Sequence, residues 1–156
     1  MSLNAFLRIG ETVTLGSHTF DADEIKHFAA KYDPQPFHVD EEAARQSIFG
    51  GLCASGWHTC AMWMRYNLKS MSRTNEAAWE GPEPRPEFGP SPGFSNLKWP
   101  KPVYAGDTIT FTRTAISHRP LATKPGWRLI SLKASAFNRK DEPVLEMDNS
   151  VLLKAG

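Results

Sequence analysis

The sequence predicts an α+β domain in which a curved antiparallel sheet wraps around one central helix. The segment from Gly51 to Met71 is the longest apolar stretch without proline, and a helix that is apolar nearly all round is buried. After it, Thr108 to Ser117, Trp127 to Asn138 and Pro143 to Lys154 each alternate apolar and polar residues, which is typical of strands. Three long antiparallel strands and one buried helix pack most economically when the sheet curves around the helix.

Length and composition fit a single domain spanning residues 1–156. The chain has 156 residues, of which 40% are hydrophobic, and this is enough for one packed core. Its net charge of +1 comes from 18 basic and 17 acidic residues. Proteins that bind nucleic acids usually carry a basic excess on one face, so this balance argues against a nucleic-acid partner.

The first part of the chain predicts a strand region followed by a helix. Glu11 to Phe20 alternates around a Gly-Ser pair and predicts one or two short strands. Asp21 or Asp23 can cap the helix that follows. We expect this helix to end near Tyr32, because residues that precede a proline, here Pro34, avoid the α region.

Shorter signals complete the expected organisation. Residues 80–93 form a proline-rich insert, which we expect on the surface or over a site. Phe94 to Trp99 is a further candidate strand, and Arg139 to Glu142 is the expected tip of the last hairpin. Asp40 is expected to cap a short helix in the sequence EEAARQS.

Cys53 and Cys60 are not expected to form a disulfide. They are seven residues apart in the predicted central helix, which separates them by about 10 Å along its axis, more than the roughly 7 Å that a disulfide tolerates. Free buried thiols are typical of a reducing compartment. No signal peptide and no apolar run of about 18 residues is visible, so we expect a cytoplasmic protein without a membrane partner.

The sequence KYDPQPFHVD places an acid and an imidazole at the two ends of a stiff segment. Asp33 and His38 are five residues apart, and Pro34 and Pro36 stand between them. Prolines fix the backbone in advance, so that two polar groups can be aimed at one point with little further ordering. A positioned acid–base pair is one interpretation. The alternative is structural: Asp33 caps a turn before Pro34, and His38 is a polar loop residue.

These residues resemble the MaoC-like family of hotdog-fold hydratases and dehydratases, which includes (R)-specific enoyl-CoA hydratases. The resemblance rests on the pattern D-x-x-P-x-H-x-D and on the turn from Pro102 to Asp107, and it spans about Gly10 to Lys154. It implies a hotdog fold, an acyl-CoA substrate with coenzyme A as part of it and no other cofactor, and a homodimer or higher homo-oligomer. The matching positions of the pattern are Asp33, Pro36, His38 and Asp40.

The resemblance also implies roles for individual residues. Asp33 and His38 hold one water and add it to one face of a double bond, and the division of labour between them stays open. The Gly51 backbone, at the expected start of the central helix, is assigned to the developing oxyanion, although Gly50-Gly51 can equally be a tight turn into that helix. Thr59 is the nearest match to a family hydroxyl, and Gln35 takes the place of the asparagine in the family's D-x-N-P-x-H, so both are assigned to substrate binding.

The predicted function is therefore a hydro-lyase acting on a 2-enoyl-CoA or 3-hydroxyacyl-CoA thioester. One alternative is a hotdog acyl-CoA thioesterase, which is disfavoured because Gly51 to Met71 contains no carboxylate. The other is a non-catalytic acyl-CoA-binding module. Two departures from the family keep it open: Gln35 replaces the usual asparagine, and Gly50 replaces the histidine of the usual His-Gly pair. His58 is expected to be a core histidine with one partner. No spacing of histidines or cysteines predicts a metal site, and no G-x-S-x-G motif predicts a serine hydrolase.

Overall fold

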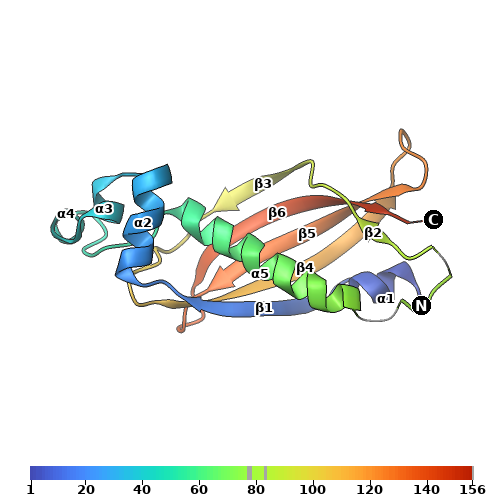
Figure 1. Ribbon diagram of the computed structural model, residues 1–156, viewed down its shortest axis with the longest axis horizontal. Coiled ribbons are helices and arrows are strands. Elements are labelled where there is room, and N and C mark those ends of the chain that lie inside the picture. Colours follow the sequence, from blue (N-terminus) through green and yellow to red (C-terminus); the bar gives the residue numbers. More distant parts are fainter. Residues whose placement is uncertain (77–78, 83, 156) are drawn as a thin grey trace.

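The molecule is a strongly curved antiparallel sheet with one long helix lying along its concave face (Figure 1). The computed structural model describes residues 1–76, 79–82 and 84–155. The order of elements is α1 (Leu3–Leu7), β1 (Thr12–Thr19), α2 (Ala22–Tyr32), α3 (Pro36–Val39), α4 (Glu41–Arg45), α5 (Gly56–Glu76), β2 (Glu87–Phe88), β3 (Gly93–Lys98), β4 (Thr108–Pro120), β5 (Trp127–Phe137) and β6 (Pro143–Lys154).

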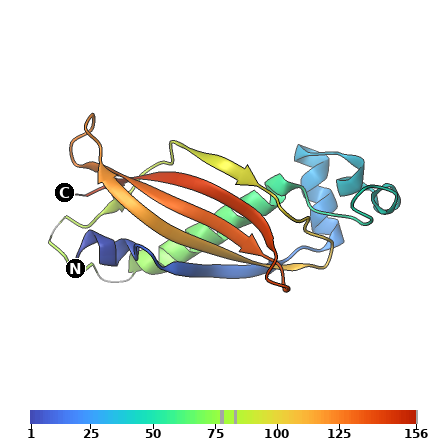
Figure 2. The ribbon, with the colours of Figure 1, turned by 180° about the vertical axis from the view of Figure 1, so that it is seen from behind.

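The sheet confirms the strands predicted for the last third of the chain. Its order is β1-β4-β5-β6-β2, and β3 pairs with β6 beside β2. The β5–β6 hairpin is the longest ladder, and its tip falls at residues 139–142, as the sequence predicts. Seen from behind, the outer face of the sheet carries no helix of the described chain (Figure 2). Short helices α2, α3 and α4 gather at the end where α5 begins (Figure 1).

The hydrophobic core fills the space between α5 and the concave face of the sheet. Trp63 of α5 is its largest fully buried side chain, and its indole N–H donates to the backbone oxygen of Thr112 on β4 at 2.9 Å. Burying an indole with its N–H satisfied avoids the cost of an unpaired polar group. From the sheet, Phe111, Ile109 and Leu145 are completely buried against this helix.

The central helix begins five residues later than the sequence predicts. It starts at Gly56, not Gly51, because the preceding segment is held in an extended conformation by the turn before β4. Ala54 N–H donates to Val103 O at 2.8 Å, and Cys53 forms an isolated bridge with Tyr104. The expectation that Cys53 lies in the same helix as Cys60 is therefore also wrong, although both cysteines are free.

The helix caps follow the sequence closely, but the segment between α2 and α4 does not form the expected loop. Asp21 caps α2 by accepting from Glu24 N–H at 2.8 Å, and Asp40 caps α4 by accepting from Ala43 N–H at 2.8 Å. Pro36 occupies the first turn of α3, a position where proline's fixed φ fits and its missing N–H costs nothing. His38 is consequently on a short helix rather than a loop.

Residues 11–20, predicted as one or two strands, form a single bulged strand. β1 pairs with β4 along its whole length, with a register shift between Thr14 and Gly16. Gly16 has φ +147, and a Cβ at this position would lie 2.5 Å from the Tyr66 ring. Glycine is needed here because the side chain of α5 occupies the space that any other residue would use.

The described part of the proline-rich insert, residues 80–93 apart from 83, lies at the other end of the molecule from α3. β2 forms within it, pairing Phe88 with Leu153 near the end of β6. The ring of Trp79, just before the insert, packs edge-on against Phe6 of α1, with 5.2 Å between ring centres. The insert is therefore on the surface, as expected, and does not line the cavity described below.

Replacing Gly16 by alanine should destabilise the fold by about 2 to 3 kcal/mol, because strain at a positive φ adds to the clash with Tyr66. Gly10 is a matched control: it has φ +85, but no atom lies within 4 Å of the place that a Cβ would take. Gly10→Ala should therefore cost only about 1 kcal/mol. Urea unfolding measures both, and equal losses would contradict the role of the Tyr66 contact.

Candidate active site

The Asp33 carboxylate lies where the end of α2 meets the start of α5. Asp33 caps α2, its N–H donating to Ala29 O at 2.8 Å, and the chain turns away at Pro34. Gln35 Nε2 donates to Asp33 Oδ1, and Ser55 Oγ donates to Asp33 Oδ2, each at 2.7 Å. Two short hydrogen bonds to a side chain that is only 16% exposed fix this carboxylate in one orientation.

His38 faces the same carboxylate from α3. Its Nδ1 lies 2.6 Å from Cys53 O, and because a carbonyl oxygen only accepts, Nδ1 carries a proton. In the neutral ring, Nε2 is then an acceptor, and it lies 3.4 Å from Asp33 Oδ2. The imidazole is almost completely buried, so its tautomer and orientation are set by the protein rather than by solvent.

Both side chains open into a cavity of about 450 Å³ between α3, the start of α5 and the segment that follows β3. Gln35 and Thr59, which the sequence assigns to substrate binding, also line this cavity, whereas Gly51 does not. Its wall is mostly apolar, and Asp33 is the one acidic residue among the described residues that form it. The remaining lining residues are Phe37, Phe49, Cys53, Ala54, Gly56, Trp57, Trp99, Pro100, Lys101, Pro102, Val103 and Val144.

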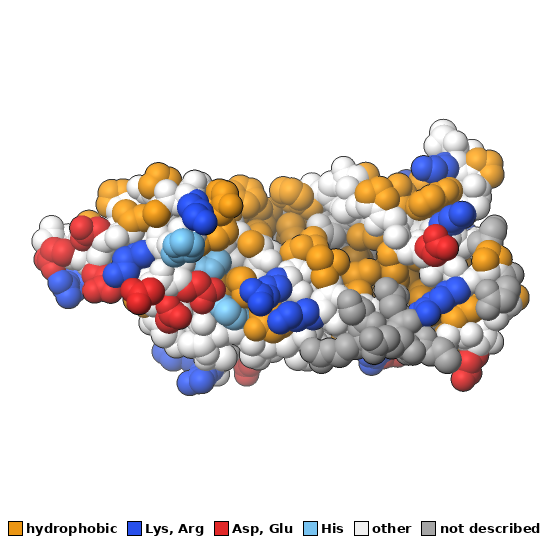
Figure 3. Space-filling view, viewed as in Figure 1, with side chains coloured by type: hydrophobic (Ala, Val, Ile, Leu, Met, Phe, Trp, Pro, Cys, Tyr) orange, Lys and Arg blue, Asp and Glu red, His pale blue; other side chains and the backbone are white. Residues whose placement is uncertain are grey.

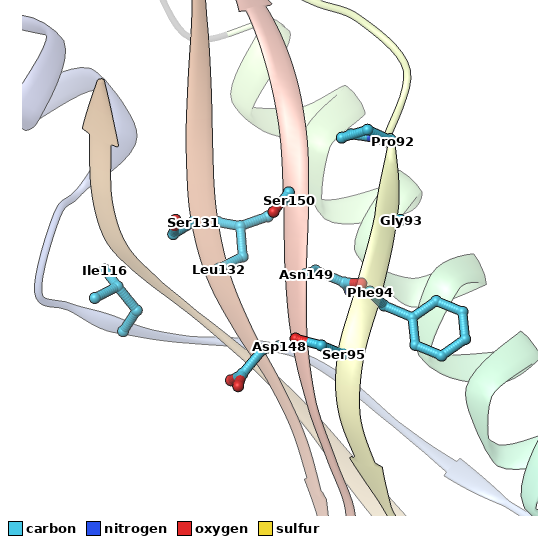
Figure 4. A pocket seen from close by; sticks show the side chains of 10 residues that line it. All are labelled: Pro92, Gly93, Phe94, Ser95, Ile116, Ser131, Leu132, Asp148, Asn149 and Ser150. Carbon is cyan, nitrogen blue, oxygen red and sulfur yellow. The ribbon is translucent and has the colours of Figure 1, made fainter. Parts of the chain in front are cut away.

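A larger hollow, of about 560 Å³, lies on the outer face of the sheet but lacks an acid–base pair among its described residues (Figure 4). Its polar side chains are serines and an asparagine of β3, β5 and β6, together with the carboxylate of Asp148. Asp148 accepts from Asn96 Nδ2 at 2.8 Å. The chemistry of the lining therefore favours the cavity at Asp33 as the functional site.

Ser55 is the site residue that sequence reasoning did not select. It lies immediately before α5, where its Oγ accepts from Trp57 N–H at 3.3 Å while donating to Asp33. Thr59, preferred from the sequence, is one turn deeper and also buried. A serine followed by glycine at the start of an apolar segment is a helix-capping signal, and it would have placed the helix start correctly.

Gly51 is not at the start of the central helix, so the structural premise for assigning its backbone to an oxyanion is wrong. Gly56 takes that place: it is the first residue of α5 and lines the cavity. A Cβ on Gly56 would lie 2.3 Å from the Trp99 ring. Glycine at this position lets the indole, and any ligand beside it, approach the helix end, where backbone N–H groups carry partial positive charge.

Cys53 is close to His38 but is not an activated nucleophile. Its Sγ lies 3.7 Å from His38 Nδ1. Burial, with a smaller contribution from the Asp33 carboxylate, raises the pKa of the Cys53 thiol to about 11. Because the thiolate is the reactive form, the thiol is inert at neutral pH. What Cys53 contributes to the site is its backbone oxygen, which orients the imidazole.

Comparison with known proteins identifies the family. The family described as MaoC like domain matches residues 6–124. The chain belongs to this family. The uncharacterized protein YdeM of Bacillus subtilis (strain 168) is 29% identical over 154 residues, which cover 99% of each chain.

Solved structures of MaoC-like proteins have the same fold. The MaoC-like dehydratase from Rhodospirillum rubrum is 33% identical, with a TM-score of 0.81, and the match covers 100% of this chain and 98% of that one. The (R)-hydratase from A. caviae involved in PHA biosynthesis is 20% identical with a TM-score of 0.67, covering 95% of this chain and 96% of that one. The predicted hotdog fold of a MaoC-like protein is thus confirmed.

This MaoC-like domain has a second histidine cluster behind the cavity. Glu24 Oε1 on α2 is shared by His18 Nε2 of β1 at 2.7 Å and by His58 Nε2 of α5 at 3.1 Å. The His58 ring stacks on Phe28, with centres 4.5 Å apart. As the sequence predicts, His58 is a core histidine with one polar partner; its Nδ1 is buried without one. The cluster joins β1 to α2 and α5; Asp33 directly follows α2, and Ser55 directly precedes α5.

In the described chain, no group of three or more histidine, cysteine or acidic side chains is placed to bind a metal ion. No helix of the described residues has the length and hydropathy that crossing a membrane requires.

The stability of the MaoC-like domain should fall as the pH is lowered below about 6.5, in part because of His58. Burial lowers the pKa of His58 from its ordinary value of 6.5, with Glu24 opposing the shift. Between the lowered pKa and 6.5, the unfolded chain binds more protons than the folded one, so the free energy of unfolding decreases as the pH falls.

His58→Phe removes this titration and keeps an aromatic ring against Phe28. Urea unfolding of both proteins between pH 5 and 7.5 should show the wild type losing stability relative to the variant on acidification, by an amount on the order of 1 kcal/mol. Parallel curves would mean that His58 takes up protons equally in the folded and unfolded states.

Proposed function

We propose that this MaoC-like protein is a hydro-lyase that adds water to a 2-enoyl thioester, or removes it from the 3-hydroxyacyl product. The observation that carries the proposal is the pair of groups at the cavity wall: His38 Nε2, which is an acceptor when the ring is neutral because Nδ1 is bonded to Cys53 O, and Asp33 Oδ2, 3.4 Å apart. Two acceptors cannot bond to each other without a proton, but both can accept from one water or from one substrate hydroxyl. Water held between them is oriented for attack.

In this reaction the water gives its hydroxyl to C3 of the enoyl group, and C2 receives a proton. The pair takes the proton from the attacking water and returns one to C2, so that no proton is gained or lost overall. Asp33 keeps its charge oriented through Gln35 and Ser55, and His38 keeps Nε2 free because Nδ1 is bonded to Cys53 O. Asp33 and His38 together carry out both proton transfers, from the water and to C2, in either order.

The start of α5 is the proposed site of oxyanion stabilisation, in place of Gly51. As C3 is attacked, negative charge grows on the thioester oxygen. Gly56 lines the cavity at the first turn of a 21-residue helix, where free N–H groups aimed at such an oxygen can contribute roughly 3 to 4 kcal/mol. The Trp99 ring takes the place that a side chain on Gly56 would occupy, so that it forms the wall of the cavity beside this helix end.

Thioester hydrolysis is the second candidate, and the described cavity gives it less support. A hotdog thioesterase would be expected to bring a carboxylate from the central helix, but the acid here, Asp33, follows α2. Residues 56–71 of α5 contain no aspartate or glutamate. Release of free thiol from an acyl-CoA substrate would nevertheless favour hydrolysis over hydration.

Loss of either acceptor should abolish most of the hydration activity. With crotonyl-CoA as substrate, the absorbance of the conjugated thioester reports hydration directly. Asp33→Asn and His38→Ala should each reduce kcat/KM by about 100-fold or more, because each removes one partner of the reacting water. Ser55→Ala should have a smaller effect, about 10-fold, because it loosens the carboxylate without removing it.

Cys53→Ser provides the control for that series. It replaces the thiol next to His38 while keeping the backbone oxygen that bonds Nδ1, so its rate should stay within about threefold of wild type. Wild-type rates in the Asp33 and His38 variants would refute the acid–base assignment. A wild-type protein that binds thioesters without converting them would instead be a binding module.

A homodimer is the proposed assembly. Large apolar side chains are exposed on the central helix and on the edge strand: Met64 (43%) and Leu68 (54%) on α5, and Phe94 (57%) on β3. Figure 3 views the face on which α5 lies, and hydrophobic side chains reach the surface along it. In the described sheet, β3 pairs with β6 on one side only, so its other edge has backbone groups available for a second copy.

Sedimentation at micromolar concentration should give the mass of two 17.4 kDa chains. Phe94→Glu should shift the protein towards monomer, because it places a charge in the apolar surface that the second copy covers. Ile48, 95% exposed beyond the end of α4, is the control, and Ile48→Glu should leave the dimer intact. A wild-type monomer would refute the proposed assembly.

A further inference from the structure

A smaller cavity lies towards the far end of α5, between this helix, α1 and the sheet. It has a volume of about 60 Å³. Asn67 and Met71 line it from α5, about 12 Å or more along the helix from Thr59. In both views of the ribbon, α1 lies beside this end of α5 (Figure 1, Figure 2). None of the described residues that line this cavity also lines the cavity at Asp33, so the two are separate spaces.

The wall of this cavity is apolar except for two arginines and one asparagine, and no acidic residue is among the described residues that form it. The polar lining residues are Arg8, Asn67 and Arg113. The apolar ones are Phe6, Leu7, Val13, Met71, Phe88, Ala115, Ile130, Leu132 and Val151.

Arg113 occupies a position of β4 that otherwise faces the core. Phe111 and Ala115, two residues before and after it, are both buried, and Arg113 continues their row along the strand. Its register partner on β1 is Val13, which also lines the cavity. Burial lowers the pKa of Arg113 from its ordinary value, and the charge of Arg8 contributes to the shift. A guanidinium nevertheless stays protonated, so β4 places a positive charge among apolar side chains.

This charge has an amide as its partner and no carboxylate within the described chain. Arg113 Nη1 donates to Asn67 Oδ1 at 2.6 Å, and Arg113 is in no ion pair among the described residues. Arg8, the other cation of the wall, is already paired with Glu11 at 2.8 Å. Because a guanidinium has five N–H donors, Arg113 retains donors that can bond to a ligand. A desolvated cation without a counter-ion is costly, and an anion beside it removes that cost.

Asn67 supplies a second donor with a weak partner. Its side chain is buried, with the residue only 6% exposed, and its Oδ1 is taken by Arg113. Its Nδ2 donates to Met71 Sδ at 3.7 Å, and a thioether sulfur is a weak acceptor. Arg113 and Asn67 therefore both offer N–H groups next to an apolar space. The complementary ligand has two strong acceptors at one end and an apolar remainder, which describes a carboxylate with an alkyl tail.

We propose that this cavity binds a short-chain monocarboxylate, such as propionate or butyrate, with its carboxylate on Arg113 and Asn67 and its tail against the apolar wall. At roughly 10–15 Å³ for each water-sized group, the cavity holds about four to six non-hydrogen atoms, which is the size of these acids. The inference is independent of the proposed hydration reaction, because the two cavities share no described lining residue.

Thermal unfolding of the wild type tests the charge and the tail of the ligand. With a Kd of about 1 mM, butyrate at about 10 mM should raise Tm by about 2 to 4 °C relative to sodium chloride at the same ionic strength. Butyramide has the shape of butyrate without its charge and should give no rise. An equal rise with inorganic phosphate at matched ionic strength would overturn the proposal, because it would show that the apolar wall plays no part.

Two variants locate the site, and each removes a different half of it. Arg113→Met keeps an unbranched side chain and removes the charge, and Ala115→Leu keeps the charge and fills the apolar space. Each should lose the rise in Tm that butyrate produces. Arg119→Met, at an exposed position of the same strand, is the matched control and should retain it. A rise that persists in both cavity variants would overturn the proposal.

Nuclear magnetic resonance of the wild type separates this site from the cavity at Asp33 without any substitution. Titration with butyrate should shift the side-chain amide signals of Asn67 and leave those of Gln35, which lines the other cavity, unchanged. Shifts at Gln35 alone, or no shift at either residue up to about 10 mM butyrate, would overturn the proposal.

Discussion

The bond between Ser55 Oγ and Asp33 Oδ2, 2.7 Å long, ties the end of α2 to the start of α5, and the rest of the site is arranged around it. Asp33 and His38 would be about 140° apart on one continuous helix and could not face each other. The pre-proline stop at Asp33 and the restart of the helix at Pro36 remove this conflict. The His38 imidazole therefore faces the Asp33 carboxylate from a separate helix, α3. Both side chains remain attached to rigid elements.

Backbone groups determine features of this site that are usually attributed to side chains. Cys53 contributes its carbonyl oxygen, which fixes the His38 tautomer, whereas its thiol stays protonated. That carbonyl is in place because residues 52–54 are bonded to the turn before β4. The same strand-like pairing delays the start of α5, so the helix N-terminus comes to lie beside the cavity. One local conformation thus sets both the orientation of the His38 imidazole beside Asp33 and the position of the electropositive helix end.

Environment gives chemically identical side chains different roles. His38 and His58 are both almost completely buried, but His38 turns one ring nitrogen towards the cavity, whereas His58 is enclosed by aromatic rings and Glu24. The first lines the cavity beside Asp33, and the second links α5 to Glu24 of α2. The cavity is likewise asymmetric, with an apolar wall around Trp57 and Trp99 and a basic residue, Lys101, at its margin.

The sequence by itself determined the curved sheet, the central helix, the caps at Asp21 and Asp40 and the candidate pair Asp33 and His38, because these depend on periodicity, proline positions and short-range capping. It did not determine where α5 starts, that Ser55 bonds Asp33, or that Gly51 lies outside α5. Those depend on hydrogen bonds between residues 22 to about 50 positions apart, such as Ser55 to Asp33 and Ala54 to Val103. Only the tertiary structure decided them, because an extended segment is stabilised by the strand-like partner it meets in the fold, and local sequence does not encode where that partner will be.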